Sequence, residues 1–156
     1  MKYKGTLIAV KDMEIAKQFY HDILGLEVVS DFGANVILTG NIFLQTADTW
    51  KTFIHKPENK ILFENNAVEL YFEEDDIDSF INKLKIFKDI IYVHPLVEHS
   101  WGQRVIRFYD PDKHIIEVGE NIEMVIKRFL NSGLSIEETA IRMDVPIEYI
   151  KSSLVQ

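Results

Sequence analysis

Residues 99–118 gather side chains that bind polar ligands and exchange protons. Imidazole and carboxylate groups act as acids or bases near neutral pH, and guanidinium groups form paired hydrogen bonds with carboxylates. Glu117 stands between two apolar residues, so strand alternation places its carboxylate on the opposite face from them. The sequence therefore predicts a ligand site that includes His99, Trp101, Gln103, Arg104, Arg107 and Glu117.

A β-hairpin is expected to position these side chains. Residues 104–109 and 114–118 have the composition of strands, and the sequence Asp-Pro-Asp-Lys between them is typical of a tight turn. Arg104 and Arg107 have odd spacing, which places them on opposite faces of a strand. At most one of these arginines is expected to face the ligand, and the other is expected to pair on the surface.

Each further candidate has a simpler alternative. His99 is expected in the loop before the hairpin, where it is either a general base or hydrogen-bond donor, or an exposed histidine without a role. Trp101 is either part of the core or a flat wall of a ligand pocket. Tyr71 shares a strand face with Glu69 and either donates to a ligand or packs on the sheet.

The composition indicates a cytoplasmic protein without nucleic-acid or membrane partners. The 156 residues are 47% hydrophobic, enough for one domain with an appendage. A net charge of -8 disfavours binding to nucleic acid or anionic membranes. The absence of cysteine excludes disulfides and thiolate metal sites and fits a reducing compartment. The N-terminal residues lack the apolar segment of a secretory signal, and we expect no membrane span.

The order strand, helix, strand, strand, strand occurs twice along the chain. In the first half, Asp12 is expected to cap the helix and Gly25 to end it. The expected strands of the first half are residues 3–10, 27–31, 36–38 and 42–46. A linker is expected at residues 50–66. The second half is expected to contain strands at 68–72 and 90–97, a helix at 76–87 between them, and the hairpin. Aligning residues 10–14 with 74–78 predicts that the last strands of the two halves match at Gln45 and Glu117.

The predicted fold class is α+β, with a domain at residues 1–120 and a C-terminal helical extension at 121–156. The domain consists of two βαβββ modules, residues 1–56 and 66–120. The extension has the spacing of a small helix-turn-helix, but its last helix offers only Lys151 as a basic residue. Packing or a dimerisation lid is therefore the preferred role for the extension, rather than DNA reading.

Several motifs resemble the vicinal oxygen chelate superfamily, which includes glyoxalase I, the fosfomycin and bleomycin resistance proteins and the extradiol dioxygenases. They are DMEIAKQFY at 12–20, LGL at 24–26 and FYDPDKH at 108–114, followed by IEV at 116–118. The resemblance covers residues 3–120. It implies that both modules curl into a cup-shaped mixed sheet, often completed by a homodimer, with a divalent metal held by up to four strand residues.

Carried over one at a time, the four metal positions of this superfamily fall on Gly5, Gln45, Glu69 and Glu117. Glycine has no ligating side chain, an amide oxygen is a weak ligand, and no imidazole remains, so a Ni²⁺, Zn²⁺ or Fe²⁺ centre is not expected. The alternatives are no metal or a weakly held Mg²⁺ or Mn²⁺. In the absence of metal, the two acids are either solvated at the mouth of the cup or paired with Arg107.

Two functions follow from the resemblance. The first is a glyoxalase-like lyase, isomerase or related enzyme in which Glu69 or Glu117 moves a proton next to a carbonyl. The second is a metal-free protein that binds or sequesters a small molecule, as the bleomycin-type resistance proteins do. Glutathione is disfavoured as a substrate, because the basic residue that holds its carboxylate falls on Ala9. Both functions imply a small-molecule ligand and a homodimer.

Overall fold

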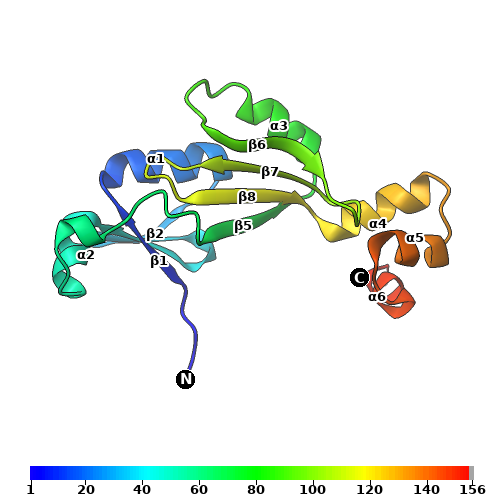
Figure 1. Ribbon diagram of the computed structural model, residues 1–156, viewed down its shortest axis with the longest axis horizontal. Helices are drawn as coiled ribbons and strands as arrows, with labels where there is room; N and C mark the ends of the chain where they lie inside the picture. Colours follow the sequence, from blue (N-terminus) through cyan, green and yellow to red (C-terminus); the bar gives the residue numbers. More distant parts are fainter. Residues whose placement is uncertain (155–156) are drawn as a thin grey trace. The chain divides into compact units, whose positions relative to one another are not determined.

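The computed structural model describes residues 1–154 and divides them into two compact units (Figure 1). The first unit contains Met1–Val68 and Tyr109–His114. The second contains Glu69–Phe108 and the chain from Ile115 onward. Each unit has a four-stranded mixed sheet, called here the first sheet and the second sheet. None of the helices in this described part of the chain has the length and apolar character needed to cross a membrane.

The first sheet has the strand order β1-β4-β3-β2, with β1 parallel to β4 and the other pairs antiparallel. Its elements are β1 (Thr6–Val10), α1 (Met13–Leu24), β2 (Val28–Asp31), β3 (Asn35–Leu38), β4 (Ile42–Thr46) and α2 (Ala47–Phe53). As predicted, Asp12 caps α1 by accepting a hydrogen bond from the Ile15 amide, and Gly25 ends it in the left-handed conformation. The sheet contributes Val10, Val36, Leu38 and Leu44 to the core.

The second sheet repeats this arrangement with the order β5-β8-β7-β6, visible as four adjacent arrows in Figure 1. Its elements are β5 (Glu69–Glu74), α3 (Ile77–Leu84), β6 (Tyr92–Glu98), β7 (Arg104–Tyr109) and β8 (Ile115–Glu120). The apolar stripe of α3 is buried, and Phe80 lies against Phe108 of β7 with ring centroids 6.4 Å apart. Because α3 covers this face, side chains on the opposite one are free of the helix, and alternation along the strands decides which side chains lie there.

Three helices follow the second sheet: α4 (Ile122–Asn131), α5 (Ile136–Met143) and α6 (Ile147–Ser153). They share a small hydrophobic core made by Val125, Ile126, Phe129, Ala140, Met143 and Ile150. Ser135 and Glu138 form the capping box that starts α5. The two βαβββ modules and the C-terminal helices are thus confirmed.

The structure corrects several predictions about local elements. The first strand begins at Thr6 rather than at residue 3, and α3 ends at Leu84 rather than at residue 87. The region expected to be a linker from residue 50 begins inside α2, a helix that has no buried residue and no side-chain cap, so neither apolar periodicity nor a capping residue marks it. The last strand of the second sheet extends to Glu120, two residues beyond the predicted end. The extension of β8 follows from its pairing with β5, in which Glu120 lies opposite Glu74.

The predicted register between the two modules is wrong by two residues. In the first sheet Leu7 pairs with Phe43, and in the second Tyr71 pairs with Glu117. The alignment of residue 10 with residue 74 makes Leu7 equivalent to Tyr71, so Phe43 rather than Gln45 is equivalent to Glu117. The chain between the strands differs in length in the two modules, and nothing in the local sequence fixes this offset.

Candidate functional site

The guanidinium of Arg107 is the centre of a polar cluster on the second sheet. Its Nε donates to Glu69 Oε2 at 2.9 Å, and its Nη2 forms an ion pair with Glu117 Oε2. Its Nη1 lies 3.2 Å from His94 Nε2. These residues come from β5, β8, β7 and β6, so every strand of the sheet contributes one side chain. We call the face that carries them the site face.

The hydrogen bonds of His94 fix the orientation of its ring. Its Nδ1 lies 2.7 Å from the carbonyl oxygen of Pro95, which can only accept, so Nδ1 donates in this contact. Its Nε2 faces the guanidinium of Arg107. Glu69, Glu117 and Arg107 together carry a net charge of about -1, by the usual ionisation of two carboxylates and one guanidinium. The side chain of Glu117 is only 7% exposed, and the arginine compensates its buried charge.

A second group of side chains continues the site face at the loop between β6 and β7. The rings of His99 and Trp101 are stacked, with centroids 4.3 Å apart. The indole N–H of Trp101 donates to Gln103 Oε1 at 3.3 Å, and Gln103 Nε2 donates to the Tyr71 hydroxyl at 2.9 Å. Tyr71 donates in turn to Glu73 at 2.8 Å. A chain of hydrogen bonds thus orients two aromatic rings that remain 39% and 49% exposed.

Gly119 makes room for this chain. A Cβ atom at this position of β8 would lie 2.8 Å from Gln103 Nε2 and 3.2 Å from the ring of Tyr71. The buried Gln103 amide also donates to the backbone carbonyl of Glu120 at 3.0 Å. The absence of a side chain in the middle of the strand therefore allows Gln103 to lie across the sheet.

The environment of His99 favours its neutral form. Partial burial lowers the pKa of His99, and electrostatic interactions with Arg107 and His94 lower it further. A neutral imidazole accepts a proton, which is the property required of a general base near pH 7. Burial has the opposite effect on the phenol, since it raises the pKa of Tyr71 and keeps this group protonated as a donor.

Arg104 lies on the other face of the sheet, as the odd spacing of the two arginines predicted for one of them. Its Nη1 contacts both carboxylate oxygens of Asp78 in α3, and its Nε and Nη2 contact Glu120 at 3.1 and 2.9 Å. Burial raises the pKa of the Glu120 carboxyl, but hydrogen bonds from Arg104 and Arg128 outweigh it and leave the pKa lowered. Arg104 therefore forms structural ion pairs with Asp78 and Glu120 and does not belong to the site face.

The equivalent positions of the first sheet, Gly5 and Phe43, have no polar side chain that could bind a metal. A Cβ atom added to Gly5 would lie 2.0 Å from the carbonyl oxygen of Asn41 and 2.6 Å from the ring of Phe43. Gln45, selected from the incorrect register, is 3% exposed, and its amide is bonded to Asn35 and Thr49 within the first unit. Among residues 1–154 no three His, Asp or Glu side chains are grouped so that they would hold a metal ion. This donor set does not fit a divalent cation.

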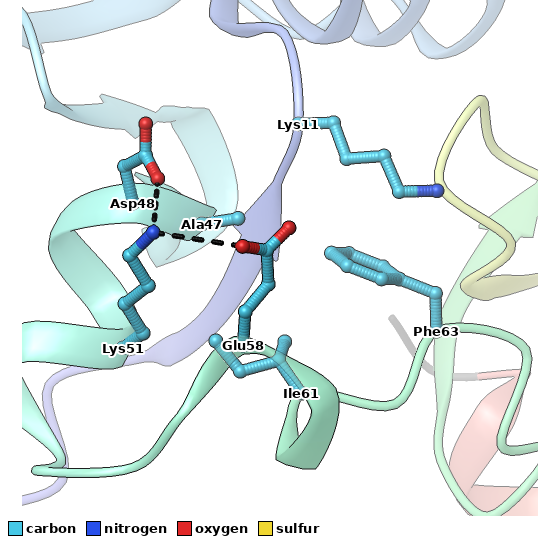
Figure 2. Close-up of a pocket in the computed structure, with 7 residues that line it drawn as sticks. All are labelled: Lys11, Ala47, Asp48, Lys51, Glu58, Ile61 and Phe63. Atoms are coloured by element: carbon cyan, nitrogen blue, oxygen red, sulfur yellow. Dashed lines mark hydrogen bonds and ion pairs between the residues drawn. The ribbon is translucent and has the colours of Figure 1, made fainter.

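A cavity of about 260 Å³ lies in the first unit (Figure 2). It contains none of the predicted site residues. Lys51 bridges Asp48 at 2.6 Å and Glu58 at 3.7 Å, as the dashed lines in Figure 2 show. Lys11 lies over the ring of Phe63, 4.4 Å from its centroid. The charges that line this cavity are thus already paired.

The family of the chain follows from its motifs and fold together. A family model described as a glyoxalase-like domain matches residues 3–123. The chain belongs to the glyoxalase-like domain family. This family places it in the vicinal oxygen chelate superfamily, as the sequence motifs indicated. The family match ends inside the first turn of α4, so α5, α6 and most of α4 lie outside the glyoxalase-like region.

Solved structures share the glyoxalase-like fold. A protein of unknown function from Agrobacterium tumefaciens is 33% identical, with a TM-score of 0.67 over 78% of this chain and 94% of the other. A glyoxalase/bleomycin resistance protein/dioxygenase family enzyme from Burkholderia phytofirmans is 13% identical, with a TM-score of 0.65 over 75% and 96%. A lactoylglutathione lyase from A. tumefaciens is 22% identical, with a TM-score of 0.58 over 78% and 94%. No curated protein matches the sequence significantly.

Two members of the site face were not among the predicted site residues. His94 precedes Pro95 in an edge strand whose pairing with β7 shifts register on both sides of it, so alternation does not assign its face. Glu73 belongs to an acidic run that the sequence indicates as the solvated start of a helix. Its position two residues after Tyr71 was a usable signal, because residues i and i+2 share a strand face.

Proposed function

We propose that the site face binds a small organic molecule without a metal ion. The observation that carries this proposal is the position of Arg107. Its guanidinium forms ion pairs with Glu69 and Glu117, the two acids of the second module that would have to bind a metal. A cation bound there would have to displace a partly buried, hydrogen-bonded arginine. The apolar character of Gly5 and Phe43 in the first module supports the same proposal.

The exposed aromatic rings supply the contact surface for such a ligand. Trp101 and Tyr71 offer flat apolar surface at low conformational cost, and each has a polar group held by a neighbouring side chain. Gln103 and Glu73 fix the direction of these groups, as expected for a site in which a few polar groups orient a largely apolar ligand. We therefore expect a ligand that combines a ring with a few hydrogen-bonding groups.

Elemental analysis and thermal unfolding test the metal-free part of this proposal. We expect protein purified without chelators to contain no stoichiometric metal, and added Mg²⁺, Mn²⁺, Ni²⁺ or Zn²⁺ to leave the Tm unchanged. One equivalent of Ni²⁺ or Zn²⁺ that is lost in a Glu117→Gln variant would contradict it.

A thermal-shift screen of ring-containing small molecules tests the ligand-binding part. We expect compounds that raise the Tm of the natural protein to lose this effect in Trp101→Ala and Tyr71→Ala variants. Trp50→Phe, which changes the other tryptophan of the chain, in α2, is the matched control and should retain the response. Binding that depends on neither Trp101 nor Tyr71 would place the ligand elsewhere.

A second candidate function is a glyoxalase-like lyase or isomerase activity. It is favoured by the neutral state of His99, which stacks on Trp101 near the acids of the site face. In this reaction His99, Glu69 or Glu117 removes a proton next to a carbonyl group. Deuterium exchange of small α-hydroxy carbonyl compounds, followed by NMR, tests the activity. Exchange that stops in His99→Gln would support it, and exchange no faster than in buffer would exclude these substrates.

We also propose that the chain forms a cytoplasmic homodimer, as the resemblance to its superfamily implies. The lack of cysteine and the charge of -8 support a reducing, aqueous location. Size-exclusion chromatography with light scattering should give twice the mass of the chain, and a mass equal to one chain across the accessible concentration range would contradict the dimer.

A further inference from the structure

Two arginines of the C-terminal helices bind the backbone of the loop between β6 and β7. Arg128 of α4 donates from Nη2 to the carbonyl oxygen of Gly102. Arg142 of α5 donates from Nη1 to the carbonyl oxygen of Ser100, and its Nη2 contacts Glu98 Oε1 at 3.1 Å. Hydrogen bonds from a guanidinium are stronger than those between neutral groups. Two carbonyls of this short loop are therefore held by the extension.

Phe129 of α4 packs against the same loop at Gly102. A Cβ atom at Gly102 would lie 2.2 Å from Phe129 Cζ, and Gly102 has a φ of +92°, a conformation that favours glycine. The guanidinium carbons of Arg128 and Arg142 lie 5.0 and 5.4 Å from the centroid of the Phe129 ring. The loop backbone, the ring and both arginines thus form one packed layer.

This layer is anchored to the second sheet. Arg128 binds both carboxylate oxygens of Glu120 at 3.2 and 3.0 Å, and Glu120 is only 3% exposed. The shared core of the three helices joins α5 to α4. The position of α5, and hence of Arg142, is therefore set by the end of β8 rather than by the loop that it contacts.

We infer that the C-terminal extension is a brace that positions the stacked His99 and Trp101 on the site face, through Arg128, Arg142 and Phe129. The biological purpose of such a brace, to hold the rings in place for a ligand, rests on the proposed ligand-binding function. It assigns a role to the part of the chain that lies outside the glyoxalase-like family match. Arg142 is a positioning residue, since it contacts the loop backbone and not the rings themselves.

Fluorescence of Trp101 tests the brace without any ligand. In a Trp50→Phe background Trp101 is the single tryptophan, and acrylamide quenching reports the access of solvent to its ring. Loss of the Ser100 contact in Arg142→Ala should release the loop, raise the quenching constant by about twofold and speed amide exchange at residues 98–103. Arg142 lies at the surface of α5, with 40% of its side chain exposed, so the variant should remain folded.

Two further variants separate positioning from general stability. Lys127→Ala also removes a cation from α4, but among residues 1–154 Lys127 forms an ion pair only with Glu123, at 3.9 Å, so Trp101 quenching should not change. Arg142→Lys keeps the charge and one donor and should restore part of the protection of Trp101. Equal quenching in the background protein and in Arg142→Ala, with unchanged exchange at 98–103, would overturn the brace. Equal increases in Arg142→Ala and Lys127→Ala would overturn it as well.

The outcome for the brace is independent of the ligand screen. The quenching and exchange measurements use the free protein, so a screen without hits would contradict the proposed function and leave the positioning result standing. If the quenching constant does not respond to Arg142→Ala while ligands are found, the binding proposal stands and the brace fails.

Discussion

The two modules use the same strand positions for opposite purposes. At equivalent places the first sheet has Gly5, Ile37 and Phe43, and the second has Glu69, Arg107 and Glu117. The equivalence of Ile37 and Arg107 follows from pairing: Ile37 is opposite Phe43, and the bond between Asp110 and His114 places Arg107 opposite Glu117. One trio is apolar, and the other is charged and joined by internal ion pairs.

This difference shows how one backbone plan supports either packing or polar chemistry. In the first module the ring of Phe43 lies where a side chain at position 5 would be, so the position is filled from the neighbouring strand. In the second module two acids remain, and an arginine between them pairs with both and compensates half of their charge. The polar side chains are therefore concentrated on the second module, where the exposed rings of Trp101 and Tyr71 also lie.

The largest expected effect comes from replacing the central residue of each trio with methionine. Arg107→Met leaves the buried Glu117 carboxylate without its cation and should lower the free energy of unfolding by about 3 kcal/mol. Ile37→Met changes shape but little volume and should cost less than about 1.5 kcal/mol. Urea denaturation measures both values.

A compensating variant checks the cause of this loss. Adding Glu117→Gln to Arg107→Met removes the uncompensated charge and should recover part of the lost stability. If Arg107→Met costs no more than Ile37→Met, the charged trio is not a buried network and the contrast between the modules fails.

A smaller difference is expected at the first position of each trio. Gly5→Ala places a methyl group 2.0 Å from the Asn41 carbonyl oxygen, and the resulting displacement should cost about 2 kcal/mol. Glu69→Ala removes a 38% exposed partner of Arg107, for which about 0.5 kcal/mol is expected. Thermal unfolding of the two alanine variants should rank them in this order. The reverse order would mean that Glu69, not the packing at Gly5, limits stability at these strand positions.

Much of the fold was predictable because its signals are local. Asp12 and Gly25 define the ends of α1 through capping chemistry, and the Asp-Pro-Asp-Lys turn defines the hairpin. The register between modules was not predictable, because it depends on the lengths of connections and not on any residue type. The selection of Gln45 instead of Phe43 shows the consequence: a shift of two residues keeps the strand face but changes the side chain completely.

The site was predictable only in part for a related reason. Strand alternation correctly indicated that Arg104 and Arg107 lie on opposite faces, but only the contacts to Glu120 and Asp78 show which one leaves the site. The role of His94 depended on the irregular pairing around Pro95, which breaks the alternation used to assign faces. Whether the cluster binds a ligand or catalyses a reaction stays a prediction.

The smallest effect concerns the titration of His99, which the charged trio is expected to influence. The pKa of His99 should lie below its usual value near 6.5, chiefly through burial and secondarily through Arg107 and His94. Because the unfolded chain then binds the proton more tightly, His99 contributes to stability at a pH above the pKa of the unfolded state. This contribution is lost as the pH falls from the unfolded pKa through the lower folded pKa.

NMR titration of the imidazole, assigned with His99→Gln, measures the pKa of His99. Arg107→Met should raise it only part of the way, since burial is the larger cause. A full return to the usual value would assign the shift to the arginine, and no change would mean that the charge of the trio does not reach the loop.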